Sequence, residues 1–223
     1  LIAASTNIAN KVGLIAVAPG PGLAEVFLSL GVDKIISGGQ TMNPSTEEFV
    51  QAIDQLEQRE IIILPNNSNI LLAAQQSASL SDKEVVVLPT KTIPQGIAAL
   101  LAHNPLAGLG EDAAAMKDGM QGVKSGQVTK AVSNAKFDDI QVKEGDFIGI
   151  GEGKLLSKGE SLDEVVLDLL HHLLVDDAEI VTLYYGEPVR KEEADQLAEK
   201  VFTVCHDCDV EVVYGGQPYY HYI

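Results

Sequence analysis

The feature that most constrains the fold is a set of four short apolar runs, rich in β-branched residues, that alternate with helical patterns. Unbroken runs of this kind are typical of strands buried on both faces, as in a parallel sheet. The runs occupy residues 12–18, 33–37, 60–64 and 84–88. Apolar residues recur at helical spacing over residues 22–31, 45–58, 67–80 and 93–103. This alternation predicts a parallel, Rossmann-like α/β lobe over residues 1–105.

The alternation of strand-like runs and helical segments ends after His103, where a connection rich in Pro and Gly begins. We expect further helices over residues 111–123, 161–174 and 190–202. Between and after them lie short strand-like segments, and the stretches "KEGD" (143–146) and "GEGK" (151–154) have the composition of hairpin turns. Residues 106–223 are therefore predicted to form a second, α+β lobe.

The charge balance narrows the class of partner. The 223 residues carry a net charge of −17, which repels phosphate backbones and anionic lipid and so argues against nucleic-acid and membrane-surface roles. No window approaches the ~18 consecutive apolar residues of a membrane span. Two closely spaced Cys form no disulfide framework, which fits a reducing compartment. We expect a cytoplasmic protein and, because the chain starts without Met, a piece of a longer one.

Polar connections follow all four predicted strands of the first lobe. They cover residues 18–22, 37–46, 64–69 and 88–96. In an open parallel sheet these connections share the carboxyl edge, where ligands bind, and each leads into a helix N-terminus that attracts anions and carbonyl oxygens. The candidate binding residues are Gly38, Gly39, Gln40, Thr41, Asn43, Ser45, Asn66, Asn67, Asn69, Lys91, Thr92 and Gln95.

A structural interpretation competes with this one. Ser45 and Glu48 have the spacing of a capping box, and helix caps and turns could explain each Ser, Asn and Pro of these connections separately. The sequence leaves open whether the polar edge binds a ligand, contacts a partner or only joins the elements.

Signals for catalysis are few. The glycines of "APGPG" (18–22) lack the Lys and hydroxyl of a phosphate-binding loop. We find no nucleophile elbow and no aspartate cluster spaced to hold Mg²⁺. "CHDC" (205–208) has no second ligand cluster, so we interpret it as incidental rather than as a zinc site. We expect no catalytic residue and no bound metal in this chain.

Five longer stretches carry a resemblance that spans essentially the whole chain. They read "APGPGLAEVFLSLGVDKIISGGQTMNPSTEEF", "ILPNNSNILLAAQQ", "VVVLPTKTIPQGIAALLAHNP", "GDFIGIGEGKL" and "VEVVYGGQPYYHYI". Together they resemble the C-terminal region of YloV-type proteins, the kinase component of bacterial fatty acid kinases, which are grouped with the dihydroxyacetone kinase (DAK2-domain) family.

The resemblance implies a fold related to DegV proteins and to the substrate-binding subunits of dihydroxyacetone kinases. It also implies that ATP and magnesium are bound by a kinase domain N-terminal to this region, so that no cofactor is expected here. The implied partner is a separate fatty-acid-binding protein, which presents an acyl carboxylate for phosphorylation.

Our leading hypothesis is a non-catalytic, partner-binding region of an acyl-phosphate-forming kinase. One alternative is the domain of a dihydroxyacetone-kinase-like enzyme that binds a small carboxylate or phosphate at the polar edge. Another is a dimerisation module, since the strand-like, aromatic segments near the C-terminus could pair with a second copy. This last alternative implies a homodimer.

Overall fold

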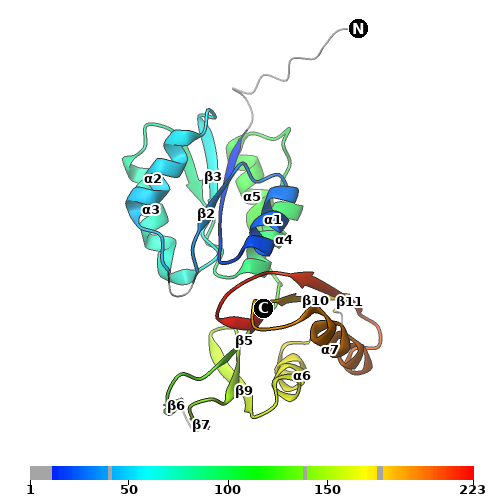
Figure 1. Cartoon of the computed structure of the whole chain (residues 1–223). Helices are drawn as coiled ribbons and strands as arrows, with labels where there is room; N and C mark the ends of the chain where they lie inside the picture. The colour runs from blue at the N-terminus through cyan, green and yellow to red at the C-terminus, as the bar shows by residue number, and fades with distance from the viewer. Residues whose placement is uncertain (1–11, 40–41, 138–139, 175–177) are drawn as a thin grey trace. The chain divides into compact units, whose positions relative to one another are not determined.

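A computed structural model describes residues 12–39, 42–137, 140–174 and 178–223 (Figure 1). These residues fall into two compact units. The second unit comprises Gly20–Leu23 and Lys124–Ile223, and the first comprises the remainder. The boundary predicted from the sequence lies between residues 105 and 106.

The first unit is built on a four-stranded parallel sheet. The strands are β1 (Gly13–Ala18), β2 (Lys34–Ser37), β3 (Glu60–Leu64) and β4 (Glu84–Val87), in the order β2-β1-β3-β4. All three pairings are parallel, and Ala18 lies opposite Ser37 while Ile63 lies opposite Val87. The connections that follow the strands therefore leave from one edge of the sheet, as predicted.

Helices cover both faces of this sheet (Figure 1). They are α1 (Pro21–Ser29), α2 (Thr46–Gln55), α3 (Leu71–Leu80), α4 (Ile93–Leu101) and α5 (Leu109–Gly119), with a short 3₁₀ turn, η2 (Ser68–Ile70), before α3. One core combines buried residues of β1, β2 and β3 with Phe49, Ile53, Ile70 and Ala74 of α2, η2 and α3. On the other face α5 contacts both α4 and β3.

A buried carboxylate fixes the start of α5. Asp112 is fully buried; its Oδ1 accepts a hydrogen bond from Asn104 N and its Oδ2 pairs with His103 Nδ1, both at 2.8 Å. These contacts hold His103 and Asn104, which follow α4, against the first turn of α5. They explain why α5 belongs to the first unit, although the Pro- and Gly-rich connection before it reads as a linker.

The second unit contains a six-stranded mixed sheet. Its strands are β5 (Gly126–Lys130), β8 (Phe147–Gly151), β9 (Lys154–Gly159), β10 (Ile180–Tyr185), β11 (Asp209–Tyr214) and β12 (Tyr220–Tyr222), in the order β11-β10-β12-β5-β8-β9. Only β10 and β11 pair in parallel. Helices α6 (Leu162–Leu173) and α7 (Lys191–Val204) share one core with this sheet. The predicted α+β character is confirmed.

The two predicted hairpin turns have different outcomes. Residues 151–154 join β8 to β9, which pair antiparallel, and Glu152 and Gly153 take the positive φ values of a tight hairpin turn. Residues 143–146 do form a tight turn, in which Asp146 N donates to Lys143 O at 3.1 Å and Gly145 has a φ of 90°, but the prediction that they close a hairpin was wrong. This turn leaves β7 (Ile140–Val142), which pairs with β6 (Ala135–Phe137), and leads to β8, which pairs with β5 and β9.

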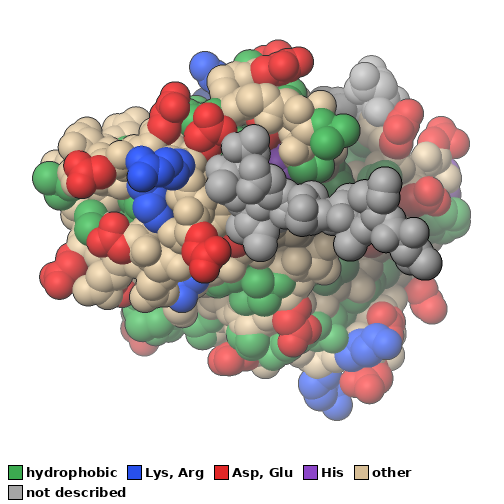
Figure 2. Space-filling model, turned by 90° about the horizontal axis from the view of Figure 1, so that it is seen from above, with side chains coloured by type: hydrophobic (Ala, Val, Ile, Leu, Met, Phe, Trp, Pro, Cys, Tyr) green, Lys and Arg blue, Asp and Glu red, His purple; other side chains and the backbone are tan. Residues whose placement is uncertain are grey.

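The surface is dominated by acidic charge. Figure 2 shows Asp and Glu side chains scattered over one face among uncharged and hydrophobic groups, in keeping with 32 acidic and 15 basic residues in the chain. Among the described residues, none of the helices is both long enough and apolar enough to cross a bilayer.

Candidate binding edge

The connection after β2 is tightly packed where it begins. Gly38 N donates to Ala18 O and Gly39 N donates to Met42 O, both at 3.1 Å. A Cβ on Gly38 would lie 2.6 Å from the Pro44 ring, so no side chain fits there. These two glycines are therefore required for packing. Gln40 and Thr41, two of the predicted binding residues, lie outside the described residues.

Ser45 acts as a helix cap. Its hydroxyl accepts a hydrogen bond from Glu48 N at 3.3 Å, and the Glu48 carboxylate accepts one from Ser45 N at 2.7 Å. The backbone and hydroxyl of Ser45 hold the pKa of Glu48 below its usual value. The capping box that the sequence indicated is confirmed, and it accounts for Ser45 without a ligand.

Asn66 joins the ends of three strands. It follows β3 with a φ of 57°, a left-handed conformation that Asn tolerates better than most residues. Its backbone N donates to Thr90 Oγ1 beyond β4, and its side-chain Nδ2 donates to Val17 O in β1, both at 3.0 Å. Asn66 and Thr90 are both buried. Thr90 was not predicted from the sequence, because a single Thr in a polar connection has no distinguishing pattern.

Two buried amide atoms at this edge have no hydrogen-bond partner among the described residues. They are Asn66 Oδ1 and Asn67 Nδ2. Their orientations are fixed, because Asn66 Nδ2 must donate to Val17 O and Asn67 Oδ1 must accept from Asn69 N at 2.9 Å. A Cβ on Gly96 would lie 2.1 Å from Asn66 Oδ1, so Gly96 leaves the space for that oxygen.

The connection from β4 to α4 is a second cap. Thr92 Oγ1 accepts from Gln95 N at 3.3 Å, and Gln95 Oε1 accepts from Lys91 N at 2.8 Å. The Lys91 side chain is exposed, as are Asn43 and Asn69 on neighbouring connections. Thr92 and Gln95 therefore order the start of α4, while Lys91 is available on the surface.

The predicted residues thus divide by their contacts. Asn66 meets Thr90 and Gly96, which were not predicted, at the ends of the strands, and Ser45, Thr92 and Gln95 belong to helix caps. Asn43, Asn69 and Lys91 are exposed and belong to no cap of an α-helix. The common edge that the sequence predicted is present. A binding role for these residues stays a prediction.

In the second unit Gln217 occupies an equally buried position. Its Nε2 donates to Tyr184 O at 2.7 Å, and its backbone oxygen accepts from Glu187 N at 3.0 Å. Its Oε1 has no partner among the described residues. Gln217 was not predicted from the sequence, because nothing in "GGQP" distinguishes a buried amide from an exposed turn residue.

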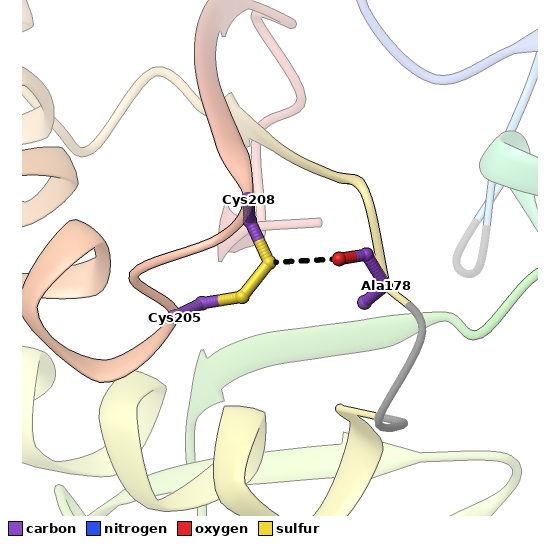
Figure 3. The surroundings of a disulfide bond; sticks show 3 residues. All are labelled: Ala178, Cys205 and Cys208. Carbon is purple, nitrogen blue, oxygen red and sulfur yellow. Dashed lines mark hydrogen bonds between the residues drawn. A yellow bond between two sulfur atoms is a disulfide. The ribbon is translucent and has the colours of Figure 1, made fainter.

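The cysteines require a correction. From the sequence, "CHDC" was interpreted as incidental and no disulfide was inferred, but the structure joins Cys205 to Cys208 (Figure 3). The turn after α7 brings their Cα atoms to 5.4 Å, within the range that a disulfide spans. Among the described residues no group of three or more His, Cys, Asp or Glu side chains could hold a metal ion.

Comparison with known proteins places the chain in a family. The model of the FakA-like family, which describes the C-terminal part of such fatty acid kinase proteins, matches residues 13–223. Protein YloV of Bacillus subtilis is 44% identical over 211 residues, which are 95% of this chain and 38% of YloV. An uncharacterised protein of Staphylococcus aureus strain MRSA252 is 43% identical over 212 residues, 95% of this chain and 39% of that protein. The chain thus spans well under half the length of these relatives.

Solved structures share the fold at low sequence identity. A DegV family protein from Corynebacterium glutamicum matches with a TM-score of 0.63 and 14% identity, over 94% of this chain and 92% of that one. The Streptococcus pneumoniae fatty acid kinase B3 protein, loaded with linoleic acid, matches with a TM-score of 0.58 and 12% identity, over 92% of each chain. The DegV-like fold implied by the sequence resemblance is confirmed.

Proposed function

Because the chain belongs to the FakA-like, C-terminal family of fatty acid kinase proteins, we propose that it is the region of a cytosolic fatty acid kinase that docks the fatty-acid-binding protein. The docked protein presents its acyl carboxylate to a kinase domain elsewhere in the full-length protein, where ATP and magnesium are bound. The region described here positions the partner and is not itself catalytic.

One observation carries this proposal: the family match runs through both units, and their fold is shared with a fatty acid kinase B3 protein that carries linoleic acid. This supports a docking role more directly than a separate enzymatic role.

The exposed residues of the polar edge are the surface that we assign to docking. Asn43, Asn69 and Lys91 are solvent-exposed, whereas Ser45, Thr92 and Gln95 are engaged in the hydrogen bonds of the caps. Exposed amides and one cation can hydrogen-bond a partner. The docking surface therefore consists of exposed side chains at this edge.

Isothermal titration calorimetry with the fatty-acid-binding protein tests this assignment. The double variant Lys91→Ala with Asn69→Ala should weaken binding by about tenfold, which corresponds to ~1.4 kcal/mol. Its melting temperature should change little, because both side chains are exposed. Lys154→Ala, which removes an exposed cation from the turn between β8 and β9, is the matched control.

The docking proposal fails if this chain does not bind the carrier under conditions in which the full-length kinase does. If the chain binds but the double variant retains full affinity, docking stands and the assigned surface is wrong. In the full-length kinase the same double variant should lower ATP-dependent acyl-phosphate formation when the carrier is limiting.

The unpaired amide atoms favour a second candidate function, the binding of a carboxylate group at the same edge. Asn67 Nδ2 is a buried donor without a partner among the described residues. Leaving such a donor unpaired costs about 1–3 kcal/mol, which a bound oxygen would offset. The carboxylate of a fatty acid is one ligand that supplies such an oxygen.

Thermal melting with added linoleate tests this second candidate. Linoleate should raise the melting temperature, and Asn67→Asp should remove the increase, because Asp keeps the oxygen that accepts from Asn69 N but loses the donor. Asn43→Asp adds the same charge at an exposed position of the edge and is the control. No linoleate-dependent shift in the unmodified chain rejects the carboxylate site and leaves the docking proposal intact.

A further inference from the structure

The two cysteines occupy different positions at the end of α7. Cys205 caps the C-terminus of the helix and its N donates to Val201 O at 3.0 Å, whereas Cys208 directly precedes β11. Cys208 N donates to Cys205 O at 3.3 Å, which closes the turn between them. Backbone hydrogen bonds, and not the sulfur atoms alone, therefore hold the two residues within bonding range.

Besides Cys205, the sulfur of Cys208 contacts a backbone oxygen (Figure 3). Its Sγ lies 3.3 Å from Ala178 O, just before β10. A disulfide sulfur carries no proton, so this contact becomes a hydrogen bond only when Cys208 is a thiol, which then donates to Ala178 O. The same backbone conformation therefore suits the oxidised pair and the reduced pair.

The two sulfur atoms also differ in access. Cys208 is 2% exposed, while Cys205 is partly exposed and is followed by exposed His206 and Asp207. A reagent from solution therefore reaches Cys205 before Cys208. This order, an accessible thiol next to a buried one, is that of an attacking and a resolving cysteine.

We propose that Cys205 and Cys208 form a reversible thiol–disulfide site that reacts with low-molecular-weight disulfides. The Cys205 thiolate attacks one sulfur of the external disulfide and releases one small thiolate, which leaves a mixed disulfide on Cys205. The Cys208 thiolate then attacks Cys205 Sγ and displaces the second small thiolate. Two protein thiols are oxidised, the external disulfide is reduced to two thiols, and the two cysteine protons go to the released thiolates.

The two cysteines also lie next to the start of the pairing between β10 and β11, so a change in their bonding can alter that pairing. Asp209 N donates to Glu179 O at 2.8 Å next to the first parallel pair of β10 and β11, and Cys208 is adjacent to Asp209. Reduction releases the covalent tie between α7 and this pairing, while the contact with Ala178 remains available. The expected change is local, at the start of the two strands.

Mass spectrometry of the whole chain, equilibrated in buffers of reduced and oxidised glutathione and then acid-quenched, tests the proposal. The unmodified chain should pass from dithiol to internal disulfide with little glutathione adduct. Cys208→Ser should accumulate the adduct on Cys205, since nothing resolves it. Cys205→Ser should accumulate about tenfold less adduct, because Cys208 is buried.

Amide hydrogen exchange provides the second readout. Amides at the starts of β10 and β11 should exchange faster in the reduced chain, and those of the first unit should not change. The proposal is wrong if the unmodified chain accumulates the glutathione adduct, if it remains a dithiol at every glutathione ratio, or if the two single variants form the adduct equally. The double Cys→Ser variant controls for reaction elsewhere.

Discussion

Substitution of Asn66 separates a structural role of the polar edge from a recognition role. Asn66→Ala removes the hydrogen bond from Nδ2 to Val17 O and places a Cβ-bearing residue without a polar side chain at a φ of 57°. Loss of a buried hydrogen bond costs about 1–3 kcal/mol and the left-handed conformation about 1–2 kcal/mol. Removal of the unpaired Oδ1 offsets part of this cost in free energy. We expect a net loss of about 2 kcal/mol in the free energy of unfolding.

Two further variants test the components of this estimate. Asn66→Gly loses the same hydrogen bond but accepts the positive φ, so it should be less destabilising than Asn66→Ala by about 1 kcal/mol. Asn66→Asp keeps the conformation but turns a carboxylate oxygen toward Val17 O, and it should be the most destabilising of the three, at about 3 kcal/mol or more.

Urea denaturation followed by circular dichroism measures the series, with the midpoints compared at a common slope. The expected order of stability is the unmodified chain, then Gly, Ala and Asp at position 66. If Asn66→Ala lies within ~0.5 kcal/mol of the unmodified chain, the three-strand junction contributes little and the structural reasoning is refuted. In that case a loss of carrier or linoleate binding would assign Asn66 to recognition.

Three further perturbations follow from other contacts. Asp112→Ala should lower the free energy of unfolding by about 3 kcal/mol, because His103 and the backbone amide of Asn104 lose their acceptor. In the same urea assay, a change no larger than that of an exposed substitution would contradict this. Gly22→Ala should cost about 3 kcal/mol by urea unfolding, since its Cβ would lie 2.0 Å from the oxygen of Tyr214, which belongs to the second unit as Gly22 does. A soluble variant of unchanged stability would disprove the close approach. Burial raises the pKa of the Tyr184 hydroxyl to about 12; the unfolded chain therefore loses this proton first, and stability should fall as the pH rises from about 10 to 12. Melting curves of Tyr184→Phe should decline less steeply over that pH range, and parallel declines would exclude Tyr184 as a cause.

The first unit was predicted well from the sequence because the information that defines it is local. The run at 60–64 is buried apart from its first residue, and the capping box at Ser45 sets the start of α2 within a few residues. Strand order and the common carboxyl edge then follow from general rules for parallel sheets. Each of these inferences needs only a short window of sequence.

The errors arose where the deciding contact is distant in sequence. The turn at 143–146 has hairpin composition, but β7 pairs with β6 and β8 pairs with β5, so the choice of partner strand overrides the turn. Asp112 looks like a solvated helix residue until its pairing with His103 is seen. The spacing of the cysteines was visible, but their distance depends on how α7 ends.

The polar edge shows why composition alone cannot separate structure from recognition. Asn66 and Asn69 are three residues apart and chemically identical, yet Asn66 spans 49 positions of sequence to reach Val17, while Asn69 is exposed. A buried amide is committed to the contacts that hold the strand ends, so its substitution changes stability before it changes recognition. An exposed amide or cation can be replaced with little effect on folding. Recognition of a partner is therefore expected to depend on Asn43, Asn69 and Lys91 rather than on the buried Asn66.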